Sequence, residues 1–144
     1  MNPKMILDDM SLHVKIKISA LWVSTMMCYL YADLLAFYQP GSIQKIMEGN
    51  LGGWQTTPGF LLVSAAVMAI PSVMIFLTLV LNASASRWFN IIFGVFDTAI
   101  ALITTVGAFK YHFYFYIFLG SIEVVLLGLI IWYAWTWPKH EVQD

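Results

Sequence analysis

Four long apolar runs dominate the pattern of the chain, at about residues 18–38, 60–81, 88–109 and 113–137. Each run holds about 20 residues or more, and at about 1.5 Å per helical residue this length crosses a hydrocarbon layer about 30 Å thick. A lone strand could not cross, because its backbone polar groups would find no partners in lipid. The pattern therefore predicts an all-α integral membrane protein with four transmembrane helices.

The polar segments between the runs predict how the helices are connected. Residues 82–87 and 110–112 are long enough only for turns, so the second, third and fourth runs should be consecutive antiparallel neighbours in a bundle. Gln39-Pro40-Gly41 ends the first run, because proline disfavours a helical residue before it. Residues 42–48 carry apolar residues at helical spacing and predict a short amphipathic helix in the first outer loop, followed by loop to residue 59.

Two local features add detail to this bundle. Pro71 lies near the middle of the second run, where it predicts a helix kink, and the neighbouring Ser72 is placed to satisfy the carbonyl that the proline frees. Residues 12–18 alternate like a strand but lead directly into an apolar run, so we interpret them as an interfacial lead-in. The expected helix caps are Asp8, Asp9 or Ser11 for the first run, and Ser84 or Ser86 for the third.

The composition agrees with a membrane setting. Of the 144 residues, 60% are apolar and 10% are charged, which is too few charges to cover a water-facing surface. We expect a single membrane domain over residues 1–144, with the lipid bilayer as its partner. The net charge of −1 provides no basic field, so we expect no nucleic-acid binding.

The distribution of cations predicts the orientation. With the N-terminus inside the cell, the cytoplasmic side carries five Lys or Arg residues and the opposite side carries two. Cytoplasmic loops of membrane proteins carry the excess of cations, so both termini are predicted to be cytoplasmic. The five are Lys4, Lys15, Lys17, Arg87 and Lys139, and the two are Lys45 and Lys110.

Three carboxylates interrupt the apolar runs: Asp33 in the first, Asp97 in the third and Glu123 in the fourth. At about 1.5 Å per residue, Asp97 and Glu123 lie about 2 and 3 Å from the centres of their runs, and Asp33 about 8 Å toward the outer face. No Lys or Arg lies at that depth to pair with them. A bare charge in hydrocarbon costs roughly 2.5 kcal/mol or more, so we expect these acids to be protonated or hydrated.

Helical spacing gives each acid a small or polar neighbour one turn away: Gly94 for Asp97, Gly120 for Glu123, and Tyr29 for Asp33. A glycine leaves room for water or a ligand, but it equally permits close helix packing. Two interpretations follow, a polar functional cavity or protonated acids that hold helices together. The candidate ligand- or ion-binding residues are Asp33, Asp97, Glu123, Tyr29, Asn90 and Thr104, the last two on the Asp97 face.

Other chemistries lack the residues they need. His13, His112 and His140 all fall outside the apolar runs and cannot converge on a metal ion or a nucleophile. Cys28 is the single cysteine and has no partner at ligand spacing. We therefore expect no catalytic residue, no metal site and no cofactor.

Four short motifs carry a resemblance to a known family: Lys15-Ile-Lys-Ile-Ser-Ala-Leu-Trp22, Tyr31-Ala-Asp33, Pro40-Gly41 and Ser86-Arg-Trp-Phe-Asn90-Ile-Ile-x-Gly94. Together they resemble a family of short bacterial four-span membrane proteins classified as a domain of unknown function. The resemblance implies a bacterial inner (plasma) membrane and four helices, and it assigns no activity to any residue. The chain also has a more distant similarity to DoxX-like four-helix membrane proteins.

Three functions remain open. The first, which we favour, is binding or transport of a small polar or cationic solute, or of protons, through a cavity lined by the three acids. Because four helices rarely enclose a path alone, this function predicts a homo-oligomer. The second is a non-catalytic accessory subunit whose acids hold its helices together. The third, a membrane enzyme acting on a lipid-like substrate, has no nucleophile, metal motif or cofactor motif behind it.

Overall fold

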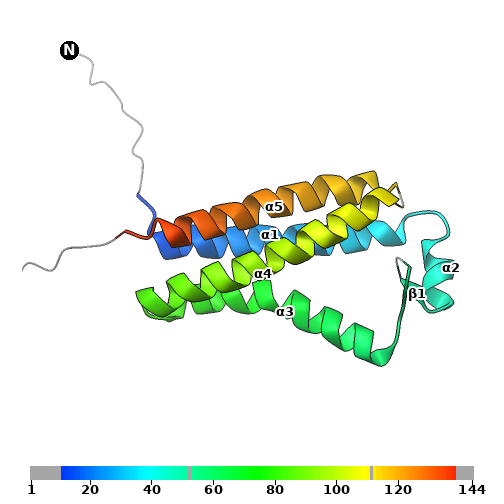
Figure 1. Ribbon diagram of the computed structural model, residues 1–144, viewed down its shortest axis with the longest axis horizontal. Coiled ribbons are helices and arrows are strands. Elements are labelled where there is room, and N and C mark those ends of the chain that lie inside the picture. Colours follow the sequence, from blue (N-terminus) through cyan, green and yellow to red (C-terminus); the bar gives the residue numbers. More distant parts are fainter. Residues whose placement is uncertain (1–10, 52, 111, 139–144) are drawn as a thin grey trace, which may run out of the picture.

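The computed structural model describes residues 11–51, 53–110 and 112–138, and its four long helices form a bundle (Figure 1). Each helix is long and apolar enough to cross a membrane, which confirms the predicted all-α membrane fold. The helices are α1 (Val14–Phe37), α3 (Pro58–Val80), α4 (Ala83–Lys110) and α5 (Tyr114–Trp135). Asp8, Asp9, Lys4, Lys139 and His140, used in the sequence predictions, lie outside the described residues.

Helices α1, α3 and α4 begin earlier than their apolar runs, and the largest differences are at α1 and α4. Helix α1 starts at Val14, where the His13 ring accepts a hydrogen bond from the Lys15 backbone N–H over 3.3 Å. Helix α4 starts at Ala83, where the Asn82 side-chain oxygen accepts from the backbone N–H of Ala85 over 2.9 Å. His13 and Asn82 therefore cap these helices in place of the predicted residues, and Ser86 is buried inside the bundle instead.

The helices surround the bundle axis in the order α3, α1, α5, α4. The most extensive contact joins α4 to α5, and α1 packs against both α5 and α3. The contact between α3 and α4 is much smaller, although a short turn joins the two helices. The start of α1 and the end of α5 lie at one end of the bundle, the termini end, and the first loop lies at the opposite, loop end (Figure 1).

The first loop at the loop end contains more structure than predicted. The expected short helix is α2 (Ser42–Met47), and after its C-cap residue Glu48 comes Gly49, whose φ of 77° belongs to the left-handed region that glycine adopts readily. A two-stranded hairpin follows, in which β1 (Asn50–Leu51) pairs antiparallel with β2 (Trp54–Gln55). The Trp54 ring stacks on Phe60 with 6.5 Å between centroids, so the hairpin is held to the start of α3.

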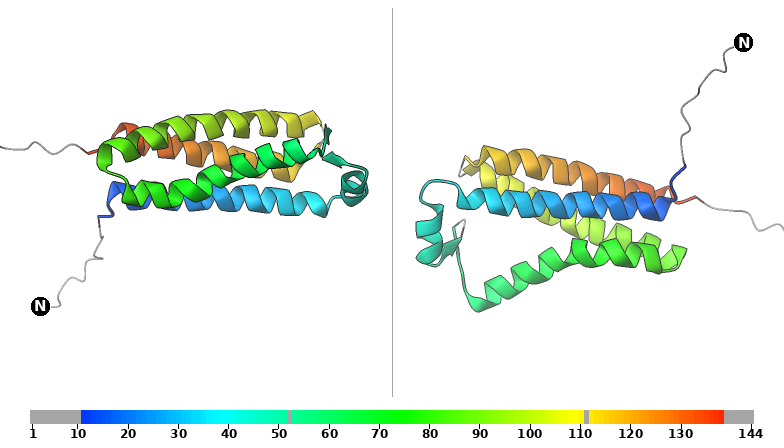
Figure 2. Two further views of the ribbon diagram at one scale, coloured as in Figure 1. Left: turned by 90° about the horizontal axis from the view of Figure 1, so that it is seen from below. Right: turned by 180° about the vertical axis from the view of Figure 1, so that it is seen from behind.

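Pro71 divides α3 into two unlike halves. The residues of α3 that are buried, Pro71, Met74 and Thr78, all lie in the half nearer the termini end. None of residues 58–70 is buried, and this half diverges from the other helices in Figure 1 and in the right-hand view of Figure 2. Ser72 donates its hydroxyl to Met26 Sδ over 3.1 Å, not to the backbone carbonyl that Pro71 frees. Pro71 therefore lies between a packed half and a loosely packed half of α3, and the kink at this proline stays a prediction.

The apolar core lies mainly in the termini half of the bundle. Ile18 and Trp22 of α1 contact Met74 of α3 and the buried face of α5 there. Most other large apolar side chains are exposed, as expected for helices that face lipid. The buried residues of α5 in this core are Leu127, Ile130 and Ala134.

Candidate acidic site

The Asn90 side chain joins three helices through a closed network of hydrogen bonds. Trp22 Nε1 and Thr78 Oγ1 both donate to Asn90 Oδ1, over 2.6 and 3.0 Å. Asn90 Nδ2 donates to the Ser86 carbonyl over 2.7 Å, and Ser86 Oγ donates to the Thr78 carbonyl over 3.0 Å. All four side chains are fully buried. This Asn90 network satisfies the polar groups of its own side chains.

A second polar layer, formed by Asp97 and Tyr29, lies about two helical turns nearer the loop end. Tyr29 follows Trp22 by the same number of residues as Asp97 follows Asn90, and α1 and α4 run in the same direction. Asp97 is only 1% exposed, yet among the described residues neither carboxylate oxygen has a hydrogen-bond partner, and the buried Tyr29 hydroxyl has none there either. The same helix pair thus holds one satisfied polar layer and one unsatisfied layer.

Glu123 of α5 and Asp33 of α1 extend this second layer. Glu123 is buried with 3% of its surface exposed, whereas Asp33 is half-buried. The Tyr29 hydroxyl lies near Asp97 and Glu123, and the Tyr116 hydroxyl of α5 lies near Asp33 and Glu123. These five side chains form the acid cluster: Asp33, Asp97, Glu123, Tyr29 and Tyr116.

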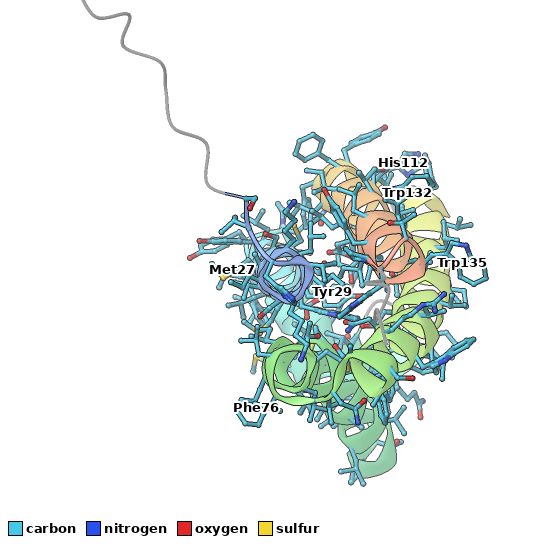
Figure 3. All side chains as sticks on the ribbon, turned by 90° about the vertical axis from the view of Figure 1, so that its left-hand side faces the viewer. Met27, Tyr29, Phe76, His112, Trp132 and Trp135 are labelled. Carbon is cyan, nitrogen blue, oxygen red and sulfur yellow. The ribbon has the colours of Figure 1, made fainter. Side chains whose placement is uncertain are left out.

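The orientation of Tyr29 places the acid cluster inside the bundle. Viewed from the termini end, Tyr29 points between the helices, whereas Met27 and Phe76 point outward (Figure 3). Within the described part of the chain, no Lys or Arg forms an ion pair with the three carboxylates. The acid cluster is therefore a concentration of oxygen ligands without a protein counter-ion.

Comparison with known proteins gives the chain a family. A family model described as a family of unknown function, DUF6326, matches residues 6–144. The chain belongs to the DUF6326 family. No curated protein and no solved structure matches it. The predicted membership of a family of unknown function is thus confirmed, while the DoxX-like similarity and the bacterial origin stay predictions.

The glycines beside the acids of this DUF6326 protein serve close helix packing. A Cβ atom at Gly94 would lie 3.0 Å from Ile131 Cγ1 of α5. A Cβ atom at Gly120 would collide with the Thr105 hydroxyl of α4. The sequence left two roles open for these glycines, room for a ligand or close helix packing. At the contact between α4 and α5, both glycines allow close packing.

Two of the predicted site residues lie apart from the acid cluster. Asn90 is about 10 Å from Asp97 along α4, and its amide is fully used by the Asn90 network. Thr104 is exposed, and its hydroxyl donates to the carbonyls of Ile100 and Ala101 over 3.0 and 3.1 Å. The adjacent Thr105 faces the helix interface instead, with 8% of its surface exposed and its hydroxyl unpartnered.

The remaining titratable groups do not form a second centre. His13 precedes α1 at the termini end of the bundle, whereas His112 lies in the turn between α4 and α5 at the loop end. Cys28 is a free, half-buried thiol on α1. In the described ranges, no group of three His, Cys, Asp or Glu side chains is placed to hold a metal ion. The acid cluster of this DUF6326 protein provides carboxyl and phenol groups, which can bind cations through oxygen and pass protons along a chain.

Proposed function

We propose that this DUF6326 protein is a small integral membrane protein that binds and transports a small polar or cationic solute, or protons, through its acid cluster. The observation that carries the proposal is the state of Asp97. Its carboxyl group lies near the middle of a membrane-spanning helix, is 1% exposed and has no hydrogen-bond partner in the part of the chain that the structure describes. Buried carboxyl groups without protein partners are rare and commonly mark ion pathways or proton relays.

The graded burial of the acids supports access from the loop end. Asp33 is half-buried about 6 Å from the end of α1, whereas Glu123 and Asp97 are 3% and 1% exposed nearer the centre. Residues 58–70 of α3 contain no buried residue, so this half of α3 does not cover the acid cluster tightly. A solute from the loop side would therefore meet Asp33 first, then Glu123, then Asp97.

The Asn90 network closes the opposite route. Trp22, Thr78, Ser86 and Asn90 leave no free polar group through which a solute could continue to the termini end. Transport would require this network to open, or a second copy of the chain to complete the path. We propose a homo-oligomer in a bacterial inner membrane, with both termini in the cytoplasm and the acid cluster reached from outside.

Replacing Asp97 tests the proposal. Asp97→Asn keeps the size of the side chain but carries no negative charge and cannot exchange a proton. In proteoliposomes, we expect this variant to reduce flux of protons, Na⁺, K⁺ or small organic ammonium ions to the level of empty liposomes. The matched control is Glu48→Gln, which neutralises an exposed acid at the loop end and should keep wild-type flux.

Circular dichroism of the purified variants checks that the helices are retained. Equal flux through the Asp97→Asn variant and the wild type would contradict a role for the acid cluster in transport. Wild-type flux no higher than that of empty liposomes would contradict transport itself.

A second function is supported by the packing of the glycines. Gly94 and Gly120 bring α4 and α5 into close contact beside Asp97 and Glu123, which suits acids that hold helices together in an accessory subunit. In that case Asp97→Asn would leave every flux unchanged but alter which membrane proteins co-purify with the chain.

A further inference from the structure

The register of α4 and α5 separates Asp97 from Glu123 along the bundle axis. Thr105 of α4 faces Gly120 of α5, because a Cβ atom at Gly120 would collide with the Thr105 hydroxyl. From this contact toward the termini end, Asp97 lies eight residues along α4 and Glu123 three residues along α5. The difference of five residues places Glu123 about 7 Å nearer the loop end than Asp97. The two buried carboxyl groups therefore lie at different depths and need a group between them to exchange a proton.

Tyr29 of α1 lies beside both acids. The hydrogen bond from Trp22 to Asn90 fixes the register of α1 and α4. Seven residues further along each helix, Tyr29 and Asp97 therefore lie at one level. The Tyr29 side chain points between the helices (Figure 3), and its hydroxyl lies near both Asp97 and Glu123. Tyr29 is thus placed to connect the two acids.

The polar atoms of Tyr29 and Asp97 are available for a hydrogen-bonded chain. Among the described residues, the Tyr29 hydroxyl and both carboxylate oxygens of Asp97 are buried without a partner. Buried polar atoms without partners cost stability and are rare in proteins. A phenol hydroxyl both donates and accepts, so Tyr29 can accept from a protonated Glu123 while it donates to an ionised Asp97.

The close packing around the acids suits protons better than larger solutes. Asp97 is 1% exposed, and Gly94 and Gly120 bring α4 into close contact with α5. A hydrated ion would have to push these helices apart, whereas a proton moves between hydrogen-bonded atoms that stay in place.

We infer that Tyr29 relays protons between Glu123 and Asp97. The inference rests on the proposed function and names protons as a substrate of the acid cluster. The proton of a protonated Glu123 moves to the Tyr29 oxygen while the Tyr29 O–H proton moves to an ionised Asp97. Glu123 is left ionised, Asp97 is protonated and the phenol is neutral again, so one proton has moved inward. Asp33, which is half-buried and lies near Glu123, receives the proton from the loop end.

Replacing Tyr29 with phenylalanine removes the relay and keeps the ring. The Tyr29 hydroxyl makes no hydrogen bond within the described chain, so Tyr29→Phe loses none there. The matched control is Tyr31→Phe, two residues further along α1, where the side chain is 50% exposed. Both variants should therefore unfold at or above the wild-type melting temperature.

Infrared spectroscopy of the full-length protein in lipid nanodiscs, transferred from ordinary to heavy water at acidic pH, follows the relay. Deuterium shifts the C=O band of a protonated carboxyl group, and the band that Asp97→Asn lacks belongs to Asp97. We expect Tyr29→Phe to slow exchange at Asp97 about a hundredfold, the lower end of what a positioned proton-transfer group contributes. Exchange in Tyr31→Phe should match the wild type.

Two results would overturn the inference. Equal exchange rates in Tyr29→Phe and the wild type would show that protons reach Asp97 by another route. Slower exchange together with a lower melting temperature would make Tyr29 a structural residue. Exchange requires no net transport, so either result leaves the flux test of the proposed function to be decided separately.

Discussion

Single residues in this bundle show two ways of burying a polar group in a membrane protein. Asn90 has a hydrogen-bond partner for both ends of its amide, so it adds specificity to the contact between α1, α3 and α4. Asp97 has no partner in the described chain, although it is buried to the same degree. A buried network that is only partly satisfied costs stability, and such a cost is expected where a site serves function.

Gly120 gives a prediction at the residue scale. Gly120→Ala would push the new methyl group against Thr105, so we expect a loss of about 1–3 kcal/mol in the free energy of unfolding. Gly128→Ala on the same helix is the matched control, because a Cβ atom there meets no atom within 4 Å. The measurement is the loss of helical circular dichroism during titration with sodium dodecyl sulfate.

Thr105→Ala should restore part of the stability lost by Gly120→Ala, since it removes the hydroxyl that collides with the new methyl group. An equal stability of the Gly120→Ala and Gly128→Ala variants would contradict the close contact between α4 and α5.

The site residues could be predicted in part, for a physical reason that differs from one residue to the next. Asp33, Asp97 and Glu123 are conspicuous in the sequence because a charge in hydrocarbon is costly. Thr104 and Thr105 are adjacent and differ by about 100° around the helix. Both fall within the polar face predicted for this helix, so the sequence could not show which of the two faces the bundle interior. Tyr116 shares a helical stripe with Glu123, yet its proximity to Asp33 depends on which helices are neighbours.

At the scale of the elements, the hydrophobic pattern predicted the four membrane helices and α2, because crossing lipid requires long apolar helices. Helix ends were less predictable, since they depend on contacts with other helices. The side chains of Lys15 and Arg87, in the first turns of α1 and α4, donate to carbonyl groups at the ends of neighbouring helices. The hairpin of β1 and β2 was missed, because strands of two residues are too short to show an alternation of apolar and polar residues. Helix order depends on contacts such as Gly120 with Thr105, which a single sequence does not reveal.

The kink in α3 gives a prediction at the element scale. Pro71→Ala restores the missing backbone hydrogen bond and should straighten α3, which brings its loop-end half closer to α4. A kink of at least about 20°, acting over about 20 Å of helix, displaces the far end by about 7 Å. Spin labels are attached to cysteines introduced at Leu62 and Ile103 in a Cys28→Ser background. Double electron–electron resonance then measures the distance between the two labels, and so between α3 and α4.

The Pro71→Ala distance distribution should shift to shorter values, while that of Ser72→Ala, at the neighbouring exposed position, should not. An unchanged distribution for Pro71→Ala would mean that the proline does not cause the separation of α3 from the bundle.

The whole molecule is asymmetric along the bundle axis. Its termini half holds most of the apolar core and the Asn90 network, and two cations cap helix ends there. Its loop half holds the acid cluster beside the half of α3 that contains no buried residue. A bundle built only as a membrane anchor would not need this difference, whereas a site reached from one side would. The asymmetry is therefore the feature that our account of function must explain.

Labelling of carboxyl groups in native membranes tests that account most directly. A cationic, water-soluble carbodiimide modifies acids that water and cations can reach, and mass spectrometry locates each modified residue. Exposed Glu48 serves as the internal standard. If the acid cluster is a cation site reached from the loop end, Glu123 and Asp97 will be modified along with Glu48. Modification of Glu48 without any modification of Glu123 or Asp97 would contradict the account.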